Sequence, residues 1–414
     1  MTFRFYPIKI ALATSLVLAT VVSSAEQVKM TSSEITDFHQ SLVTLDSHVD
    51  IPRDYMRLPV FDPSNNTSLK VDFNKMKKGG LDAVFHIVYV AQKKRDKAGY
   101  AAAYKAAMKK FEALHMMEKQ YAEQIAIAYS TKDVKRIIAE GKLVSIIGVE
   151  NGFPLAKDIN RVDEFYKLGA RYLGLTHTGH NDICDSSGTK PEYGDKLEEH
   201  GGVSEFGKDV INRMNQLGMM VDVSHASDKC VKQVLQISKA PIIASHSGVQ
   251  SMLNHSRNLN DNLIKAIAKK KGVIQLVAYS GFIKSDPKRN LAYKSLKAKV
   301  AERYKSTKFD YKHHEYTPEY ARGFMQLNLD YPLATVKQYI DQIEYAIKIA
   351  GIDHVGISSD FDGGGELFDW KDGSETENVT RELLSRGHSK TDIQKIWAGN
   401  LLRVWSDVEQ FAKK

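Results

Sequence analysis

Histidine and acidic side chains follow six short apolar runs of this 414-residue sequence, each close to the point where the run ends. Imidazole and carboxylate groups bind divalent metal ions in proteins, and both also transfer protons. A lone histidine after a strand more often has a structural role. Residues with unrelated structural roles would not all be expected at the ends of strands, however. The pattern predicts a metal site that draws on His48, Asp50, Glu150, His177, His225, His246 and Asp360.

The spacing of these residues indicates a site for two ions. His48 and Asp50 are two positions apart, so they share one face of an extended strand and can bind the same ion. His225 and His246 are separated by one strand–helix unit, so neighbouring strands can bring them to a second ion. Glu150 lies between the two groups, and a carboxylate can bridge ions about 3.5–4 Å apart. With no thiolate among the ligands, zinc is favoured, and manganese, cobalt and iron are its competitors.

Four polar residues near these candidates receive a different interpretation. The stretch HTGHND contains His180 and Asp182 beside His177, and we interpret both as loop residues rather than ligands. His255 is likewise expected to be a solvated loop residue. Asp222, in VDVSH, is expected to support a ligand from behind rather than to bind metal.

The apolar runs themselves predict the strands of a parallel sheet. They are nearly continuous and rich in β-branched residues, which is typical of strands covered on both faces. Amphipathic stretches separate them, and one of these has Ser204 as its candidate N-cap and Gly218 as its end. The eight runs are 41–48, 81–90, 143–150, 170–177, 219–225, 241–247, 273–280 and 354–360.

Eight strands alternating with helices predict an α/β fold, a (β/α)₈ TIM barrel of the metal-dependent hydrolase type with helical insertions. An open doubly wound sheet is the alternative, but the sequence has no glycine-rich phosphate turn after an early strand. We expect one catalytic domain over 26–414, with insertions at about 92–140 and 282–330. The second insertion could overhang the rim on which the carboxyl ends of the strands meet.

The first 25 residues have the features of a secretory signal peptide. Arg4 and Lys9 precede an apolar run of about 13 residues, which is too short to span a bilayer, and small residues follow it. We therefore expect an exported protein, periplasmic or secreted, without a stable membrane anchor. An exported compartment permits a disulfide, and the pairing of Cys184 with Cys230 stays open.

Charge gives little sign of a macromolecular partner. The formal net charge is +8, or +6 once the two basic residues of the signal peptide are removed. The lysines are scattered through helical patterns such as 104–124, and we interpret them as a solvated surface. Without a clustered basic stripe, no nucleic-acid partner is expected.

Seven motifs, in chain order, resemble those of the membrane dipeptidase (renal dipeptidase) family of zinc-dependent, amidohydrolase-type barrel peptidases. The resemblance runs from about residue 40 to the end of the chain, where NLLRVW also belongs to it. The seven motifs are LDSHVDIP (45–52), IIGVENG (146–152), LGLTHTGHND (173–182), GMMVDVSHAS (218–227), APIIASHSGVQSM (240–252), SRNLND (256–261) and VGISSDFDG (355–363).

The resemblance assigns a role to each matched position. It implies two Zn²⁺ per chain, with Glu150 bridging them. The remaining metal ligands would be His48 and Asp50 for one ion, and His225 and His246 for the other.

Three further residues would act on the substrate by the same resemblance. His177 would contact the substrate carbonyl and stabilise the oxyanion, so it would not be a ligand. Arg257 would pair with the C-terminal carboxylate of the substrate. Asp360 would bind substrate and transfer protons as a metal-bridging hydroxide attacks.

The implied function is that of an exported metallopeptidase hydrolysing small dipeptide substrates that have a free C-terminal carboxylate, including those with a D-residue at the second position. The resemblance also implies a homodimer. Two alternatives stay open: a related hydrolase of N-acyl amino acids, lactones or phosphoesters, and a non-catalytic zinc-binding exported protein.

Two positions depart from the pattern of the family. Asn151 stands where the family usually has the first glycine after the glutamate, a change that should leave the role of Glu150 intact. Arg53 stands where many members have an aromatic residue in the substrate pocket, and it suggests acidic or polar substrates.

Overall fold

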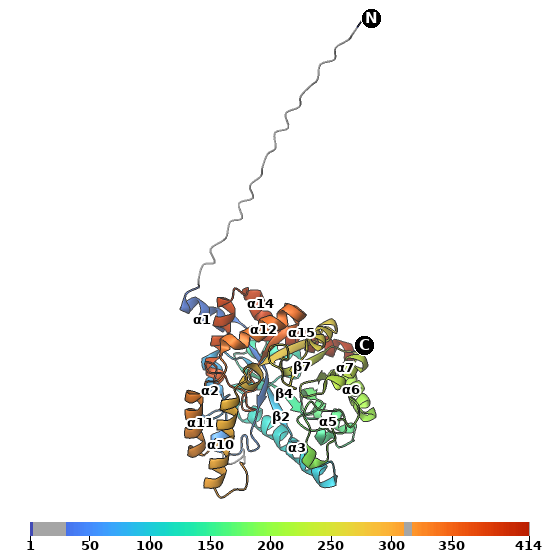
Figure 1. Ribbon diagram of the computed structural model, residues 1–414, viewed down its shortest axis with the longest axis vertical. Helices are drawn as coiled ribbons and strands as arrows, with labels where there is room; N and C mark the ends of the chain where they lie inside the picture. Colours follow the sequence, from blue (N-terminus) through green and yellow to red (C-terminus); the bar gives the residue numbers. More distant parts are fainter. Residues whose placement is uncertain (3–29, 310–316, 414) are drawn as a thin grey trace.

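A barrel of eight parallel strands forms the centre of the molecule (Figure 1). The computed structural model describes residues 1–2, 30–309 and 317–413, so the predicted signal peptide lies almost entirely outside the described residues. In order around the barrel, the strands are β1 (Leu45–Asp50), β2 (Ala83–Tyr89), β4 (Leu143–Glu150), β5 (Ala170–Gly174), β6 (Met220–Asp222), β7 (Ile242–Val249), β9 (Val273–Val277) and β10 (Val355–Ser358).

The barrel closes where β1 meets the segment that follows β10. Val49 forms a parallel bridge with Phe361, and the amide of Asp50 donates to the Phe361 carbonyl at 2.9 Å. Each of the eight predicted runs overlaps one barrel strand, although β1 and β7 extend two residues beyond their runs, and the predicted (β/α)₈ fold is confirmed. Two short strands lie off the ring: β3 (Ile125–Ile127) pairs with the first half of β4, and β8 (Asn258–Leu259) pairs with the end of β7.

Helices surround the barrel, and one of them, α6, begins and ends where the sequence predicts. The Ser204 side chain caps α6 by accepting from the Gly207 amide, and Gly218 ends that helix at φ 80°. The helices are α1 (Ser32–Ser41), α2 (Phe73–Gly79), α3 (Lys97–Gln120), α4 (Thr131–Ala139), α5 (Asn160–Lys167), α6 (Glu205–Leu217), α7 (Asp228–Ile237), α8 (Asp261–Lys269), α9 (Ser280–Ile283), α10 (Pro287–Arg303), α11 (Pro318–Asp330), α12 (Val336–Ala350), α13 (Glu377–Ser385), α14 (Lys390–Gln394) and α15 (Asn400–Ala412).

The two expected insertions differ in how they join the core. Residues 92–140 contain α3, β3 and α4, and α3 is packed into the core along a stripe that includes Ala103, Ala107 and Leu114. Residues 282–330 contain α10 and α11, which lie side by side at one edge of the molecule (Figure 1). Among the described residues, α3 contributes buried side chains to the main core, whereas α10 and α11 contribute none.

Helix α15 packs against the end of the barrel at which the strands begin. Trp405 packs against Phe85 inside the barrel, with ring centroids 6.1 Å apart. The Asn400 amide donates to the carbonyl of Val355, the first residue of β10. This packing closes the end at which the strands begin and leaves their carboxyl ends for chemistry. No helix among the described residues is long and apolar enough to cross a membrane.

Candidate metal centre and active site

The predicted residues lie together at the carboxyl ends of the barrel strands. Asp50 and Glu150 are the last residues of β1 and β4, and His246 lies within β7. His225 follows β6 by three positions, and Asp360 follows β10 by two. Parallel strands in a barrel deliver these positions to one rim, so residues scattered along the sequence become neighbours.

Glu150 is the centre of this group. Its Oε2 lies 3.6 Å from Nε2 of His48. Its Oε1 lies 3.1 Å from Nε2 of His225 and 3.3 Å from Nε2 of His246. The two carboxyl oxygens therefore face different histidines, which is the arrangement of a carboxylate that bridges two ions.

The described residues contain three overlapping sets of side chains that could each hold a metal ion. Within each set, the ligand atoms lie within 4.8 Å of one another. The sets are His48, Glu150 and His246; Glu150, His177 and His225; and His48, Asp50 and Asp360.

The electrostatics of the group suit cations. Burial lowers the pKa of both His225 and His246 well below the ordinary value, which keeps these imidazoles neutral and able to ligate. Burial would raise the pKa of Glu150, but the neighbouring His177 and His48 and the hydrogen bonds of His225 and His246 hold it well below the usual range. Among the described residues, the buried Nε2 of His48 has no hydrogen-bond partner. Bound cations would satisfy these converging lone pairs, so the residues fit the implied metal pair.

Hydrogen bonds behind the histidines fix which ring nitrogen faces the centre. Tyr172 donates its hydroxyl to the Ser47 carbonyl at 3.1 Å, so it accepts from Nδ1 of His48 at 2.9 Å. The Nε2 lone pair of His48 is then free to bind metal.

A similar relay lies behind His246. Ser245 donates its hydroxyl to Asp222 Oδ2 at 2.7 Å and so accepts from Nδ1 of His246 at 2.8 Å. The other oxygen of Asp222 accepts from the backbone amides of Ser224 and Ser245. Asp222 therefore supports His246 and is not a ligand in this arrangement.

His177 stands at the edge of the metal centre. Its Nε2 is 4.0 Å from Glu150 Oε1, which is longer than the corresponding distances of His225 and His246. Its ring lies between the rings of Tyr89, at 4.7 Å, and His225, at 4.2 Å. The side chain is 26% exposed, more than the other histidines of the group, so it faces the space where a substrate would lie.

Asp360 has the properties of a group that holds a proton. Burial, with the nearby charges of Asp50 and Glu150, raises its pKa well above the ordinary value. Its backbone has φ 57°, and the turn that follows brings Gly363 against it. A Cβ at Gly363 would lie 2.3 Å from Asp360 Oδ1 and 2.5 Å from Asp50 Oδ2, so a side chain at this position would displace the two carboxylates.

Arg257 brings a positive charge to the same rim. One guanidinium nitrogen, Nη2, donates to the His246 carbonyl at 3.1 Å, while the buried Nε has no partner among the described residues. Burial lowers the pKa of Arg257 to about 10, so the side chain stays charged at neutral pH. A buried arginine with an unused donor beside a metal centre is suited to binding a carboxylate.

The polar loop residues take structural roles. Nδ1 of the buried His180 accepts from the Ser186 amide at 3.0 Å, and its Nε2 contacts the Lys196 carbonyl. Asp182 accepts from the Tyr100 hydroxyl at 2.8 Å. Nδ1 of His255 accepts from the Arg257 amide. None of the three belongs to a possible metal set among the described residues.

The two departures from the family pattern lie in different surroundings, since Asn151 is buried and Arg53 is on the surface. Asn151 adopts φ 76°, a conformation that favours glycine and that asparagine tolerates. Its amide donates to the Val90 carbonyl at 2.9 Å and its oxygen accepts from Asn181 at 2.9 Å, so it ties the end of β4 to the end of β2 and to the loop after β5. Arg53 is exposed.

One prediction about the lysines is wrong at a single position. Lys110, within the stretch interpreted as a solvated surface, is only 8% exposed. Its Nζ lies 4.0 Å from Asp50 Oδ1 and 5.6 Å from the centre of the Tyr89 ring. Burial lowers its pKa, while the charges of Asp50 and Glu150 act in the opposite direction. Helical spacing contained the signal, because Lys110 falls on the stripe that includes Ala103, Ala107 and Leu114.

The two cysteines are joined. Cys184, in the loop after β5, forms a disulfide with Cys230 in α7, with Cα atoms 6.2 Å apart. The question left open by the sequence is thereby answered in favour of a bridge.

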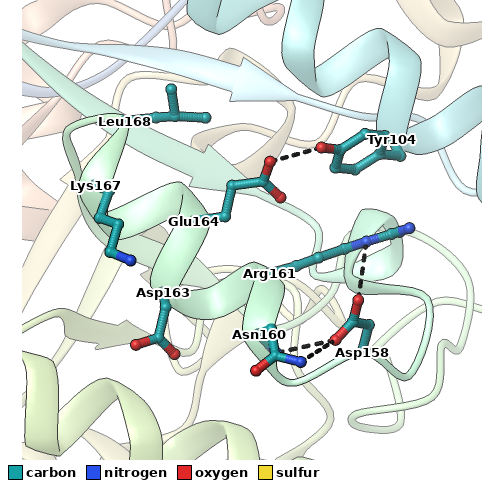
Figure 2. Close-up of a pocket in the computed structure, with 8 residues that line it drawn as sticks. All are labelled: Tyr104, Asp158, Asn160, Arg161, Asp163, Glu164, Lys167 and Leu168. Atoms are coloured by element: carbon teal, nitrogen blue, oxygen red, sulfur yellow. Dashed lines mark hydrogen bonds and ion pairs between the residues drawn. The ribbon is translucent and has the colours of Figure 1, made fainter.

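A separate surface pocket of about 730 Å³ lies beside α5 (Figure 2). Its polar groups bind one another: the Tyr104 hydroxyl donates to Glu164 at 2.6 Å, and Asn160 donates to Asp158 at 3.0 Å. It contains none of the candidate residues, and its lining is Tyr104, Asp158, Asn160, Arg161, Asp163, Glu164, Lys167 and Leu168.

The chain is similar to known dipeptidases over most of its length. It is 28% identical to "Dipeptidase tcpJ" of Claviceps purpurea (strain 20.1) over 357 residues, which cover 85% of this chain and 72% of that protein. It is 27% identical to "Dipeptidase verJ" of Clonostachys rogersoniana over 383 residues, covering 89% and 85% respectively.

Solved structures of related proteins are also similar to this chain over most of its length. The probable dipeptidase PvdM from Pseudomonas aeruginosa superimposes with a TM-score of 0.80 at 32% identity, covering 92% of this chain and 98% of that one. A metallo peptidase from Rhodobacter sphaeroides, liganded with a phosphinate mimic of the dipeptide L-Ala-D-Ala, has a TM-score of 0.69 at 19% identity, covering 89% and 99%, and shows the shared fold. The model of the family described as membrane dipeptidase (Peptidase family M19) matches residues 32–414, and the chain therefore belongs to that family.

Proposed function

We propose that this protein is a binuclear zinc dipeptidase that hydrolyses dipeptides with a free C-terminal carboxylate. The observation that carries the proposal is the position of Glu150, whose two oxygens face His48 on one side and His225 and His246 on the other. A peptide bond is a poor electrophile, and paired divalent ions are suited to its hydrolysis.

The ligands would divide into two groups that share Glu150. His48 and Asp50, which lie in one candidate set, would hold one ion. His225 and His246, which both face Oε1 of Glu150, would hold the other. When bound, zinc supplies Lewis acidity and lowers the pKa of a coordinated water. Imidazole and carboxylate ligands without thiolate favour zinc.

The remaining residues would orient the substrate. Arg257, held by the His246 carbonyl, would direct its free donor to the terminal carboxylate. His177, partly exposed beside Glu150, would donate to the carbonyl oxygen of the scissile bond as negative charge develops there.

Asp360 would move the proton. Burial raises its pKa above that of an ordinary carboxyl group, which makes it a stronger proton acceptor. It lies 4.0 Å from Nε2 of His48, so it borders the reacting atoms. The proton would then pass to the leaving amine, which must be protonated to depart as a neutral group.

Three finer features belong to the same proposal. We expect dipeptides with a D-residue at the second position to be substrates, which a panel with both stereoisomers tests. We expect export directed by residues 1–25, which cell fractionation tests. We expect a homodimer, which sedimentation of the mature chain tests.

The activity test uses purified protein, a dipeptide panel and the Arg257→Met variant. Chelation should abolish hydrolysis, and zinc should restore it. Arg257→Met should raise KM about 10–100-fold, since hydrogen bonds between charged groups contribute about 1.5–3 kcal/mol. The control is Arg322→Met, at a side chain that is 69% exposed on α11. Turnover that persists in metal-free protein, or a KM unchanged in Arg257→Met, would contradict the proposal.

A further inference from the structure

Lys110 is a buried cation that the proposed hydrolysis does not use. It lies on the inner stripe of α3, and its side chain reaches the rim of the barrel from outside the ring of strands. Its one ionic contact among the described residues is with Asp50 Oδ1 at 4.0 Å, which is longer than a hydrogen bond. Bound cations would compensate the charge of Asp50, so the ammonium would be left with capacity for another anion.

Lys110 and Arg257 stand at different ends of the metal centre. Lys110 lies beside Asp50 of β1 and Tyr89 of β2, whereas Arg257 donates to the carbonyl of His246 in β7. These strands are not neighbours in the barrel. A substrate that spans the centre would therefore meet a buried positive charge at each end.

The contacts between the two cations indicate which part of the substrate meets Lys110. With the terminal carboxylate at Arg257 and the scissile carbonyl at His177, the first residue lies beyond His177. The ring of Tyr89 is 4.7 Å from the ring of His177, and Lys110 lies against the ring of Tyr89. Tyr89 and Lys110 would thus be the residues nearest to the first side chain of the dipeptide.

We propose that Lys110 and Tyr89 form a specificity subsite that prefers a dipeptide whose first residue has a carboxylate side chain. The inference rests on the proposed function and adds a substrate class to it. A fixed ammonium attracts a carboxylate strongly in a site from which water is largely excluded, whereas it gains little from an uncharged amide of the same shape.

The test compares Glu-Ala with Gln-Ala, which differ by one charged group. Zinc-loaded wild type should have a kcat/KM at least tenfold higher for Glu-Ala. In Lys110→Met, Glu-Ala should lose at least tenfold more than Gln-Ala, so the preference disappears. Lys105→Met is the matched control, because Lys105 is exposed on the same helix, and it should keep the wild-type ratio.

Two further measurements separate the possible failures. Zinc content per chain detects a role of Lys110 in balancing the charge of Asp50. If Lys110→Met loses zinc and slows both dipeptides equally, or if wild type does not distinguish them, the subsite is refuted. Calorimetric binding of phosphinate analogues of Glu-Ala and Gln-Ala tests the preference without turnover. If wild type hydrolyses neither dipeptide yet binds the Glu analogue tenfold more tightly through Lys110, the dipeptidase proposal fails and the subsite stands.

Discussion

The two halves of the metal centre are held in place by different means. In the strand half, His48 and Asp50 belong to β1 and Glu150 to β4, so the backbone ladders of the barrel position them. In the loop half, His177 and His225 follow the ends of β5 and β6, outside the ladders. Ladder hydrogen bonds set the register of neighbouring strands, whereas a residue in a loop depends on contacts specific to that loop.

The loop half is held by Ser186 and its neighbour. The Ser186 hydroxyl lies 2.5 Å from the His177 carbonyl and 3.2 Å from the His225 carbonyl. The amide of Ser187 donates to the same His225 carbonyl at 2.8 Å, where the backbone of His225 has φ 68°. A left-handed conformation at a histidine is costly and persists only with such support. The comparison teaches that His48, Asp50 and Glu150 depend on the barrel alone. The site of the second ion combines His246 of β7 with His225, which depends on a short loop.

The largest effect is expected from Glu150→Gln, because Glu150 links the two halves. The amide keeps the size of the side chain but removes the charge that two cations would share. We expect the zinc content to fall from two per chain and kcat/KM to fall roughly 10³-fold or more. Metal analysis and dipeptide kinetics measure both. The control is Glu112→Gln, whose side chain is 64% exposed. A variant that keeps two ions per chain would show that the halves bind metal independently.

The site residues of both halves are predictable from the sequence, but the contacts that hold the loop half in place are not. Strand-borne residues follow apolar runs directly, so the order of the runs and their common rim suffice to locate Asp50, Glu150 and His246. The eight strands are predictable for the same reason, since periodicity and β-branching are local properties. The left-handed backbone of His225 and the hydroxyl of Ser186 have no local signal, because both depend on contacts between distant segments.

Two other outcomes show where a local pattern is insufficient. Composition assigns Lys110 to the surface, although the helical stripe through Ala107 and Leu114 places it inside. The sequence leaves the disulfide open, because spacing along the chain does not give the distance between Cys184 and Cys230 in the fold. In both cases, the missing information is which elements pack against each other.

The next effect is expected from opening the disulfide that anchors the loop half. Cys184 lies two residues before Ser186, and the Asp185 carbonyl accepts from the Ser227 amide at 2.9 Å close to the other cysteine. The Cys184→Ala, Cys230→Ala double variant should lose about 2–4 kcal/mol in free energy of unfolding. It should also bind the ion of His225 and His246 more weakly, while the ion of His48 and Asp50 is retained.

Denaturant unfolding and stepwise zinc titration measure these two effects. Wild type treated with a reductant provides an independent comparison without a mutation. Equal weakening of both ions would mean that the loop supports the whole centre rather than one half.

The smallest effect concerns the contact between β2 and β4, the strands that support the strand half. His86, buried in β2, forms a 2.8 Å hydrogen bond between Nδ1 and the Ser145 hydroxyl of β4. Burial lowers its pKa to about 3 from an ordinary value of 6.5. Above pH 6.5 the imidazole is neutral in both states. As the pH falls from 6.5 toward 3, the unfolded chain binds a proton that the folded chain does not, so His86 makes the folded state progressively less stable.

His86→Gln should therefore reduce the loss of stability between pH 8 and pH 4.5 by about 1–3 kcal/mol. Glutamine can keep a hydrogen bond to Ser145 and does not titrate. Unfolding of metal-free protein at both pH values isolates this effect from the release of metal by protonated ligands. The control is His115→Gln on α3, at a half-buried histidine outside the barrel. If the free energy of unfolding falls by the same amount in wild type and His86→Gln, the acid sensitivity arises from the metal ligands and not from His86.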